Sequence, residues 1–537
     1  MARNEDFFIL KPGKISLSEL KKIYLGHYHK FVICTSAHDG IKQAVEVVQK
    51  VIRKGQVVYG VNTGFGKLAN TRIPTDNLVE LQHNLVLSHC VGVGEYVDDA
   101  LVKLITVLKI NSLARGHSGV RLETMKLLLK FINQGYFPCI PCQGSVGASG
   151  DLAPLAHLVA PLIGEGYVKK NGKVISAVEA LTELNEQPIE LGPLEGLSLL
   201  NGTQVSTAFA LKGFFEAEGL LSASVLAGAM SVDALRGSTT PFRSEIHELR
   251  GQHGQKAVAE ALSVLLRGSE IRNSHENCEK VQDPYSLRCQ PQVVGACLDQ
   301  LNHAARILEV EANAVTNNPI VMPETGEILS GGNFHAEPVA FVSDSLAIIL
   351  SEIASISERR TALMVDPNFS GLPAFLINGS GLNSGFMIAQ VTAAALVSEN
   401  KSLCFPCSVD SIPTSASQED HVSMATHAAR RLFRIAENTK NVIAIEFLSA
   451  AQALDFLRPL RSSQILEKTH AAIRERVSFY KKDRFMANDM KSIAEFVGSL
   501  NLSFFSQSQS LSILPNFLEM DDLIQLSGEN HELLQSN

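Results

Sequence analysis

Residues 144–157 read GSVGASGDLAPLAH, and three glycines recur in this stretch at every third position, as Gly144, Gly147 and Gly150. Glycine adopts backbone conformations that other residues rarely reach, and it does so at an entropic cost. A cluster of glycines therefore indicates that the backbone itself is used here, either in an ordinary loop or in chemistry.

The tripeptide Ala148-Ser149-Gly150 has the residue types for an internal cyclisation. In a sharply bent chain, the amide nitrogen of Gly150 attacks the carbonyl carbon of Ala148 and closes a five-membered ring that contains Ser149. Loss of water from the ring and from the serine side chain leaves a methylidene group conjugated to an imidazolone, which is a strong electrophile. Chance supplies on the order of a few tenths of such a tripeptide in a chain of this length, so the tripeptide alone favours an ordinary loop.

The residues that follow the tripeptide are expected to begin a helix. Asp151 is placed to cap this helix, and Pro154 falls in its first turn. The electrophile would then lie beside a helix N-terminus, whose partial positive charge favours electron-rich groups.

Composition limits the class of protein. The chain has 537 residues, of which 45% are hydrophobic and 19% charged, and its formal net charge is −8 without a basic tract. Nucleic acid and anionic membranes are therefore not predicted as partners. The apolar runs 338–353 and 385–399 are interrupted by Asp344 and Gln390, whereas a bilayer span needs about 20 apolar residues. Nine cysteines without an export signal indicate reduced thiols and a cytoplasmic location.

Hydrophobic periodicity predicts a mainly α-helical protein. Short β-like runs such as QVVYGV (56–61) alternate with helical stretches in the first part of the chain, whereas long stretches with apolar residues three and four apart follow after about residue 200. We predict an N-terminal mixed domain carrying the cofactor loop (1–200), a bundle of long antiparallel helices (201–502) and an acidic C-terminal tail (503–537). The tail is interpreted as flexible or loosely docked rather than as a recognition peptide.

Several motifs resemble known sites but lack an essential part. Residues 64–69 have the glycine spacing of a dinucleotide fingerprint, but no long helix or terminal acid follows as the fingerprint requires. Ser149 is not a hydrolase nucleophile, because Asp151 stands where that motif needs glycine. The Cys-x-x-Cys pairs at 139–142 and 404–407 each enclose a proline and lie far apart. Neither a nucleotide nor a required metal is predicted.

The glycine-rich stretch resembles the signature of the aromatic amino acid ammonia-lyases, which build the cofactor 4-methylidene-imidazol-5-one (MIO) from this tripeptide. Six further segments resemble that family in the family's order, and together they extend over about residues 5 to 500. They are YGVNTGFGKLA (59–69), LVLSHCVGVGE (85–95), LLNGTQ (199–204), QDPYSLRCQPQVVG (282–295), GGNFHAEP (331–338) and SQEDHVSM (417–424). The last three are more similar to the histidine-specific branch than to the phenylalanine or tyrosine enzymes.

The resemblance implies an ammonia-lyase-like fold and the conversion of L-histidine to trans-urocanate and ammonia, the first step of histidine degradation. It also implies autocatalytic formation of MIO from Ala148-Ser149-Gly150, and a homotetramer whose active sites are shared between subunits. A tyrosine or phenylalanine ammonia-lyase, or an aminomutase of the same family, is the nearest alternative. A silent scaffold is a further alternative, and a fumarase-like lyase is disfavoured because its signature is missing. The sequence does not choose between addition of the substrate through its amine and through its ring.

The resemblance also assigns roles to the ends of the substrate. Tyr59 matches the catalytic base that removes the β-proton, and we expect an electropositive site to lower its pKa. Arg288 matches the residue that binds the substrate carboxylate, which its planar fork suits. Asn201 and Tyr285 match residues that line the electrophile and the amino-acid end, with Tyr285 counted as catalytic together with Ser149. The alternatives are a packed core tyrosine at 59 and a structural ion pair at 288.

The remaining matched residues concern the ring of the substrate. His89 and Glu419 would contact the imidazole, and Glu419 is also predicted to be catalytic. A site with buried hydrogen-bonding groups rejects a substrate that cannot pair with them by up to about 10⁴-fold, so these two residues favour histidine over phenylalanine. Gln282 and Phe334 match further pocket positions. Without the resemblance, a helix-capping glutamate and a core histidine would be the simpler interpretations.

Overall fold

The computed structural model describes residues 7–275 and 281–500, so the predicted tail at 503–537 lies outside the described residues. The chain divides into two compact units, and each unit is built from three separate segments. The first comprises Met1–Gly213, Ala304–Asp344 and Pro406–Leu432; the second comprises Phe214–His303, Ser345–Phe405 and Phe433–Asn537. The unit that carries the glycine-rich stretch thus continues past residue 200 and takes in two later segments.

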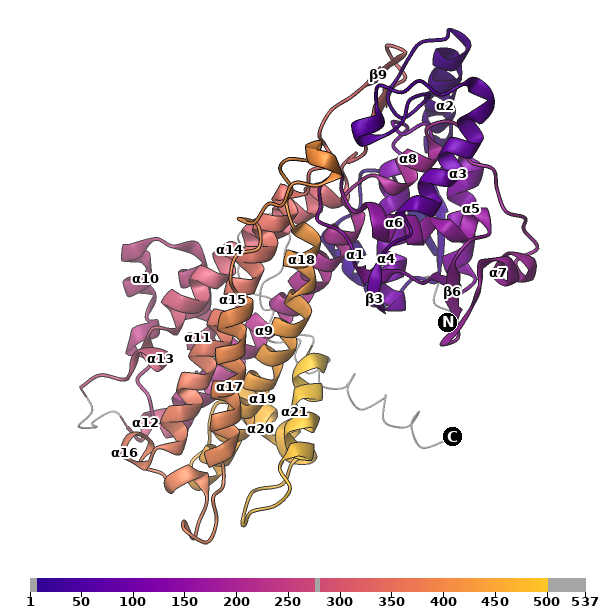
Figure 1. The fold of residues 1–537 in the computed structure, drawn as a ribbon. Coiled ribbons are helices and arrows are strands. Elements are labelled where there is room, and N and C mark those ends of the chain that lie inside the picture. Colours follow the sequence, from indigo (N-terminus) through magenta and orange to yellow (C-terminus); the bar gives the residue numbers. More distant parts are fainter. Residues whose placement is uncertain (1–6, 276–280, 501–537) are drawn as a thin grey trace. The chain divides into compact units, whose positions relative to one another are not determined.

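The first unit mixes helices of moderate length with short strands (Figure 1). Its helices in the N-terminal segment are α1 (Leu17–Tyr24), α2 (His38–Arg53), α3 (Leu78–His89), α4 (Asp99–Leu113), α5 (Leu122–Asn133), α6 (Leu152–Val159), α7 (Ala177–Glu183) and α8 (Glu195–Leu200). The later segment 406–432 adds α18 (Ala425–Arg430). The mixed character predicted for this part of the chain agrees with these elements.

Helix α4 forms the centre of the first unit. Asp98 caps it by accepting the backbone N–H of Leu101 at 2.8 Å. Twelve of its residues are buried, including Lys109, because apolar side chains occupy almost every side of the helix. A helix that is apolar all round belongs inside a protein, and α4 accordingly places Lys109 in the interior.

The strands of the first unit form four small sheets rather than one large sheet. β1 (Phe7–Leu10) pairs in parallel with β2 (Lys30–Ile33), and the other pairs are antiparallel. They are β3 (Val93–Tyr96) with β5 (Pro141–Gln143), β4 (Phe137–Pro138) with β6 (Tyr167–Lys170), β6 with β7 (Lys173–Ser176), and β8 (Ile320–Met322) with β9 (Glu327–Leu329). The β-like run 56–61 is not a strand, so that prediction was wrong; residues 56–58 have no regular structure and a turn follows.

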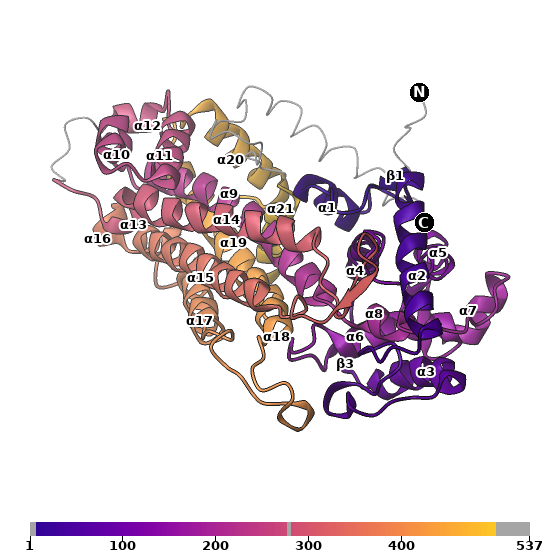
Figure 2. The same cartoon turned by 90° about the horizontal axis from the view of Figure 1, so that it is seen from above.

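The second unit is built almost entirely of helices, and Figure 2 shows its long helices lying along one another. The long ones are α9 (Gln204–Ala234), α14 (Gln290–Ala312), α15 (Glu337–Val365), α17 (Met387–Leu403) and α19 (Leu432–Phe456), of which α9, α14, α15 and α19 have one end in the first unit. Shorter helices complete it: α10 (Ser244–Arg250), α11 (His253–Leu265), α12 (Glu270–Asn273), α13 (Tyr285–Arg288), α16 (Pro367–Ser370), α20 (Gln464–Arg476) and α21 (Ala487–Ser499).

A buried ion pair joins three of these helices. Arg360 on α15 donates from Nε and Nη2 to the two carboxylate oxygens of Glu446 on α19, at 2.5 and 2.8 Å, and both side chains are fully buried. Ser231 on α9 and Ser357 on α15 each donate to Glu446 at 2.6 Å. The carboxylate is therefore saturated with donors, as a buried charge requires.

The long helices do not all alternate in direction. Gln390 near the start of α17 bonds to Glu358 near the end of α15, whereas Cys404 just after α17 bonds to Ser351. Helix α17 is therefore antiparallel to α15. By contrast, Leu350 and Ser357 of α15 bond to Thr439 and Glu446 of α19 in the same order, so these two helices run in the same direction.

Helix α15 is the one helix among the described residues that is long and apolar enough to cross a membrane, judged by length and composition. However, 67% of its most apolar window is buried within the structure. This degree of burial is that of a core helix.

Candidate active site

The glycine-rich stretch runs between β5 and α6 in the first unit and adopts backbone angles that favour glycine. Gly147 and Gly150 have φ values of +66° and +70°. Gly150 also lies against Gly202, where an added Cβ would meet the carbonyl oxygen of Gly202 at 2.2 Å. Gly150 is therefore required twice, by its backbone conformation and by the close approach of a second chain segment.

Asp151 ties this stretch to two other elements. Its carboxylate accepts the backbone N–H and the hydroxyl of Ser206 on α9 at 2.7 and 2.9 Å, the hydroxyl of Thr426 on α18 at 2.6 Å and that of Ser145 at 3.0 Å. Asp151 occupies the N-cap position of α6, as predicted, but its side chain makes no capping bond to this helix. Complete burial raises the pKa of Asp151, and the four hydrogen bonds oppose that shift.

Ser149 lies between two side chains from distant parts of the sequence. Its hydroxyl donates to Oε1 of Glu419 at 2.7 Å, and its carbonyl oxygen accepts from Nδ2 of Asn201 at 2.8 Å. The second carboxylate oxygen of Glu419 accepts from the hydroxyl of Thr414 at 2.7 Å, which fixes the orientation of the carboxylate. The tripeptide thus has an acceptor beside the serine hydroxyl and a donor on the serine carbonyl.

Asn201 is itself held on both sides. Its Oδ1 accepts the backbone N–H of Asn318 at 2.6 Å, and the side chain of Asn318 in turn accepts the backbone N–H of Gly331 at 2.7 Å. Phe334 follows three residues later and is half-buried. This chain of hydrogen bonds connects the segment that carries Phe334 to Asn201, although no direct contact of Phe334 with the Ser149 cluster is found.

Lys109 is a member of this site that sequence reasoning missed. Its ammonium group donates to the carbonyl oxygen of Asn201 at 2.6 Å and to Gln204 at 3.4 Å. Complete burial lowers the pKa of Lys109 to about 7, and the charge of Asp151 opposes the shift only in part. Its only signal in the sequence is that it is a lysine within a helix of mainly apolar residues.

Tyr59 is half-buried, and its hydroxyl accepts the backbone N–H of Gly66 at 3.4 Å. Burial raises the pKa of Tyr59, and the negative charge of Glu419 raises it further. The expectation of a lowered pKa for Tyr59 was therefore wrong.

His89 is the last residue of α3 and is also half-buried. Burial lowers its pKa, so the imidazole is neutral at neutral pH, although the charge of Glu419 acts in the opposite direction. Its Nδ1 lies 2.8 Å from the carbonyl oxygen of Leu85. This contact makes Nδ1 the donor and leaves the lone pair on Nε2.

The other predicted residues belong to the second unit. Gln282, Tyr285 and Arg288 line one cavity of about 520 Å³ within it. The guanidinium of Arg288 stacks on the ring of Tyr285 at 4.7 Å and donates to the carbonyl oxygen of Asp283 at 3.0 Å. The structure thus gathers Tyr59, His89, Ser149, Asn201 and Glu419 in the first unit and three further residues in the second.

Comparison with known proteins shows the family to which the chain belongs. The model of the family described as aromatic amino acid lyase matches residues 15–475. The chain is 56% identical to a histidine ammonia-lyase of Idiomarina loihiensis over 491 residues, which is 91% of this chain and 96% of the relative. This chain belongs to the aromatic amino acid lyase family.

Solved structures of the family share its fold. A histidine ammonia-lyase from Trypanosoma cruzi superposes with a TM-score of 0.84 at 40% identity, covering 92% of this chain and 93% of that chain. A tyrosine aminomutase from Streptomyces globisporus superposes with a TM-score of 0.85 at 34% identity, covering 90% and 95%. The predicted ammonia-lyase-like, mainly α fold is therefore confirmed.

Proposed function

We propose that this chain is an enzyme that eliminates ammonia from L-histidine and releases trans-urocanate. The observation that carries the proposal is the 2.7 Å hydrogen bond from Ser149 to Glu419, which joins the cyclising tripeptide to the carboxylate suited to an imidazole N–H. The 56% identity to a histidine ammonia-lyase over most of both chains supports the same substrate.

We infer that Ala148-Ser149-Gly150 matures into MIO, which supplies an electrophilic carbon for the substrate. The residues present fit this maturation. Gly150 carries no side chain on the Cα atom next to its attacking amide nitrogen. Its positive φ also bends the chain. The hydroxyl that leaves as water is held by a hydrogen bond to Glu419, and it takes up a proton as its bond to the β-carbon breaks. Asn201 donates to the carbonyl oxygen of Ser149, an oxygen that the ring retains.

The substrate ring would be recognised by Glu419 and His89. Glu419 accepts a hydrogen bond from an imidazole N–H, and neutral His89 offers a lone pair on Nε2 because Nδ1 is committed to Leu85. A phenyl ring would leave both groups unpaired, which is costly in a partly buried site. These contacts support histidine rather than phenylalanine.

Tyr59 is proposed to remove the β-proton of the substrate. Because its pKa is raised, Tyr59 is a neutral phenol at neutral pH. Its phenolate, which is the form that acts as a base, requires positive charge nearby. The cationic ammonium group of the substrate would provide such charge on binding.

Arg288, Tyr285 and Gln282 are proposed to bind the amino-acid end of the substrate. Arg288 offers a planar fork to the carboxylate, and we infer that Tyr285 and Gln282 line the same end, because all three border one cavity. We further infer a homotetramer with shared sites, and a cytoplasmic location that agrees with eight cysteines that are outside disulfides among the described residues.

The test combines a substrate assay with a measurement of intact mass. Purified protein is incubated with histidine, tyrosine and phenylalanine, and urocanate is followed by its near-ultraviolet absorbance. We expect urocanate from histidine alone, and a chain lighter than its coded mass by about two waters. Ser149→Ala should abolish both the mass deficit and the activity.

Each outcome bears on a different part of the proposal. Product from tyrosine but not from histidine would support the aminomutase or tyrosine-lyase alternative. A full coded mass in protein that turns over histidine would contradict the MIO proposal while leaving the substrate assignment intact.

A further inference from the structure

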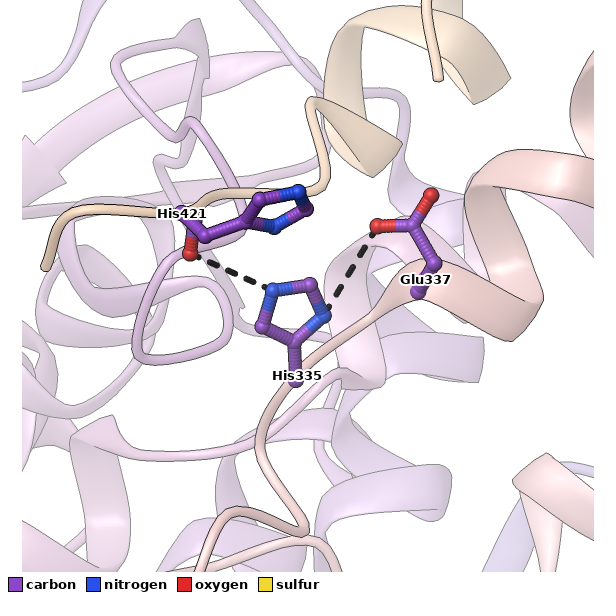
Figure 3. Close-up of side chains that lie close together, drawn as sticks. All are labelled: His335, Glu337 and His421. Carbon is purple, nitrogen blue, oxygen red and sulfur yellow. Dashed lines mark hydrogen bonds and ion pairs between the residues drawn. The ribbon is translucent and has the colours of Figure 1, made fainter. Parts of the chain in front are cut away.

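Three side chains outside the Ser149 cluster converge in the first unit. Glu337 is the first residue of α15, His335 lies two residues before it, and His421 lies in the segment that precedes α18 (Figure 3). One ligand atom from each residue, a ring nitrogen or a carboxylate oxygen, lies within 4.8 Å of the other two. The two imidazole rings are 5.7 Å apart and inclined by 33°.

His335 is oriented by a hydrogen bond to the backbone. Its Nε2 lies 3.3 Å from the carbonyl oxygen of His421, so Nε2 carries the proton and donates. The lone pair is therefore on Nδ1, which faces Glu337 (Figure 3). Histidines that bind metals show this arrangement, in which one ring nitrogen donates to a carbonyl oxygen and the other binds the ion.

Glu337 contributes an oxygen that lacks a partner. Its Oε2 is shielded from solvent and accepts no hydrogen bond from the described residues. The nearest ring nitrogen, Nδ1 of His335, is 3.8 Å away, which is too far for a hydrogen bond. A shielded carboxylate oxygen without a partner is unfavourable, and a cation between Glu337 and the two histidines would remove that cost.

We propose that His335, Glu337 and His421 form a binding site for a divalent cation of the zinc type. Two imidazole nitrogens and one carboxylate oxygen are ligands that Zn²⁺ accepts, and three protein ligands leave a fourth position for water or another molecule. Ligand atoms around a tetrahedral Zn²⁺ lie about 3.4 Å apart. The three side chains need to approach one another by about 1 Å, which rotation about their side-chain bonds provides.

The site would cross-link two segments that are remote in sequence. His421 follows Glu419 by two residues, so an ion held at His421 restrains the segment that carries Glu419 relative to the start of α15. The proposal rests on the three side chains alone and does not depend on the proposed reaction. A ligand that binds only the folded chain also stabilises it.

Metal binding by the full chain tests the proposal. Protein stripped with a chelator is titrated with Zn²⁺ by calorimetry, and bound zinc is counted by elemental analysis after dialysis. We expect one tight equivalent per chain. His335→Ala, His421→Ala and Glu337→Gln should each weaken this site by roughly 10-fold or more.

His29→Ala serves as the control, because His29 is exposed and lies before β2, outside the cluster; it should keep the tight equivalent. Zn²⁺ should raise the thermal unfolding midpoint of the wild type and of His29→Ala but not that of Glu337→Gln, whose shape is conserved so that it folds. A wild type without a tight equivalent, or Zn²⁺ affinity unchanged in all three cluster variants, would overturn the proposal.

Discussion

At the scale of the residue, Glu419 makes contacts that fit two proposed roles, one in formation of the cofactor and one in binding the substrate ring. One carboxylate oxygen accepts from Ser149 and the other from Thr414. The charge of Glu419 adds to the raised pKa of Tyr59 and partly opposes the lowering of the pKa of His89 by burial. The same side chain is thus placed to assist maturation and to contact the substrate ring. A conservative substitution can separate these roles, because maturation is read from the mass and substrate contact from the kinetics.

Glu419→Gln is expected to lower kcat/KM for histidine by roughly 10²-fold, since a hydrogen bond to a charged group is replaced by a neutral one. Steady-state kinetics on protein of known intact mass measures this. Asp420→Asn, which removes an adjacent exposed carboxylate, should leave kcat/KM nearly unchanged. Equal losses in the two variants would contradict the role given to Glu419.

Because the pKa of Lys109 is lowered in the folded chain, we expect the free energy of unfolding to depend on pH. Its pKa is about 7 in the folded chain and 10.5 in the unfolded chain, so between these values the unfolded chain binds the extra proton. Stability therefore rises with pH across this window, by up to about 1.4 kcal/mol per pH unit, and the contribution is constant below pH 7. Urea unfolding at pH 7, 8 and 9 should show this rise, and Lys109→Met should flatten it.

The matched control is Lys126→Met, which removes an exposed lysine on α5 whose charge is solvated in both states. Its unfolding free energy should follow that of the wild type at each pH. A slope that persists in Lys109→Met would mean that Lys109 is not buried in its neutral form.

At the scale of the element, a few polar side chains fix how helices meet. Asp151 joins the cofactor loop to α9 and α18, and the Arg360–Glu446 pair joins α9, α15 and α19. Both carboxylates are completely buried and surrounded by donors. Because each carboxylate is buried, removing one of its partners is expected to destabilise the fold. The charge that is left without a partner stays desolvated.

Arg360→Met is expected to destabilise the chain by about 3–5 kcal/mol, because Glu446 keeps its charge in the core without a partner. Adding Glu446→Leu to this variant should recover much of the loss, since the unpaired charge is then removed. Arg434→Met, at a pair on α19 whose arginine is 61% exposed, should change stability by less than about 1 kcal/mol. Urea unfolding measures all three, and equal effects of Arg360→Met and Arg434→Met would contradict this account.

At the scale of the whole molecule, the predicted site residues are divided between two compact units. The long-helix unit also exposes apolar side chains on α17, with Ile388 61% and Val391 51% exposed. Exposed apolar side chains at helical spacing are typical of a surface covered in an assembly. They support the inferred homotetramer.

Dilution tests the assembly. If sites are shared between subunits, specific activity should fall in parallel with the tetramer fraction when the protein is diluted to the point of dissociation. Size-exclusion chromatography with light scattering gives the fraction, and the urocanate assay gives the activity. Monomers with full specific activity would contradict shared sites.

The residues by themselves predicted a mainly helical chain, because apolar positions three and four apart leave few other ways to bury them. The residue types of Ala148-Ser149-Gly150 are compatible with cyclisation but by themselves favour an ordinary loop, and only the resemblance of the surrounding segments to a known family predicted the chemistry. The β-like run at 56–61 was misleading, because a short apolar run has no strand to pair with here and forms an irregular segment and a turn instead.

The sequence by itself determined what depends on neighbours along the chain, namely the helices, the conformations of the glycines and the presence of the tripeptide Ala148-Ser149-Gly150. Only the tertiary structure decided that the carboxylate of Asp151 turns away from its own helix, that Lys109 is buried with a pKa of about 7, and that His335, Glu337 and His421 converge. Burial and charge depend on segments that are hundreds of residues apart in sequence. Their effects on pKa and hydrogen bonding therefore exist only once the chain has folded.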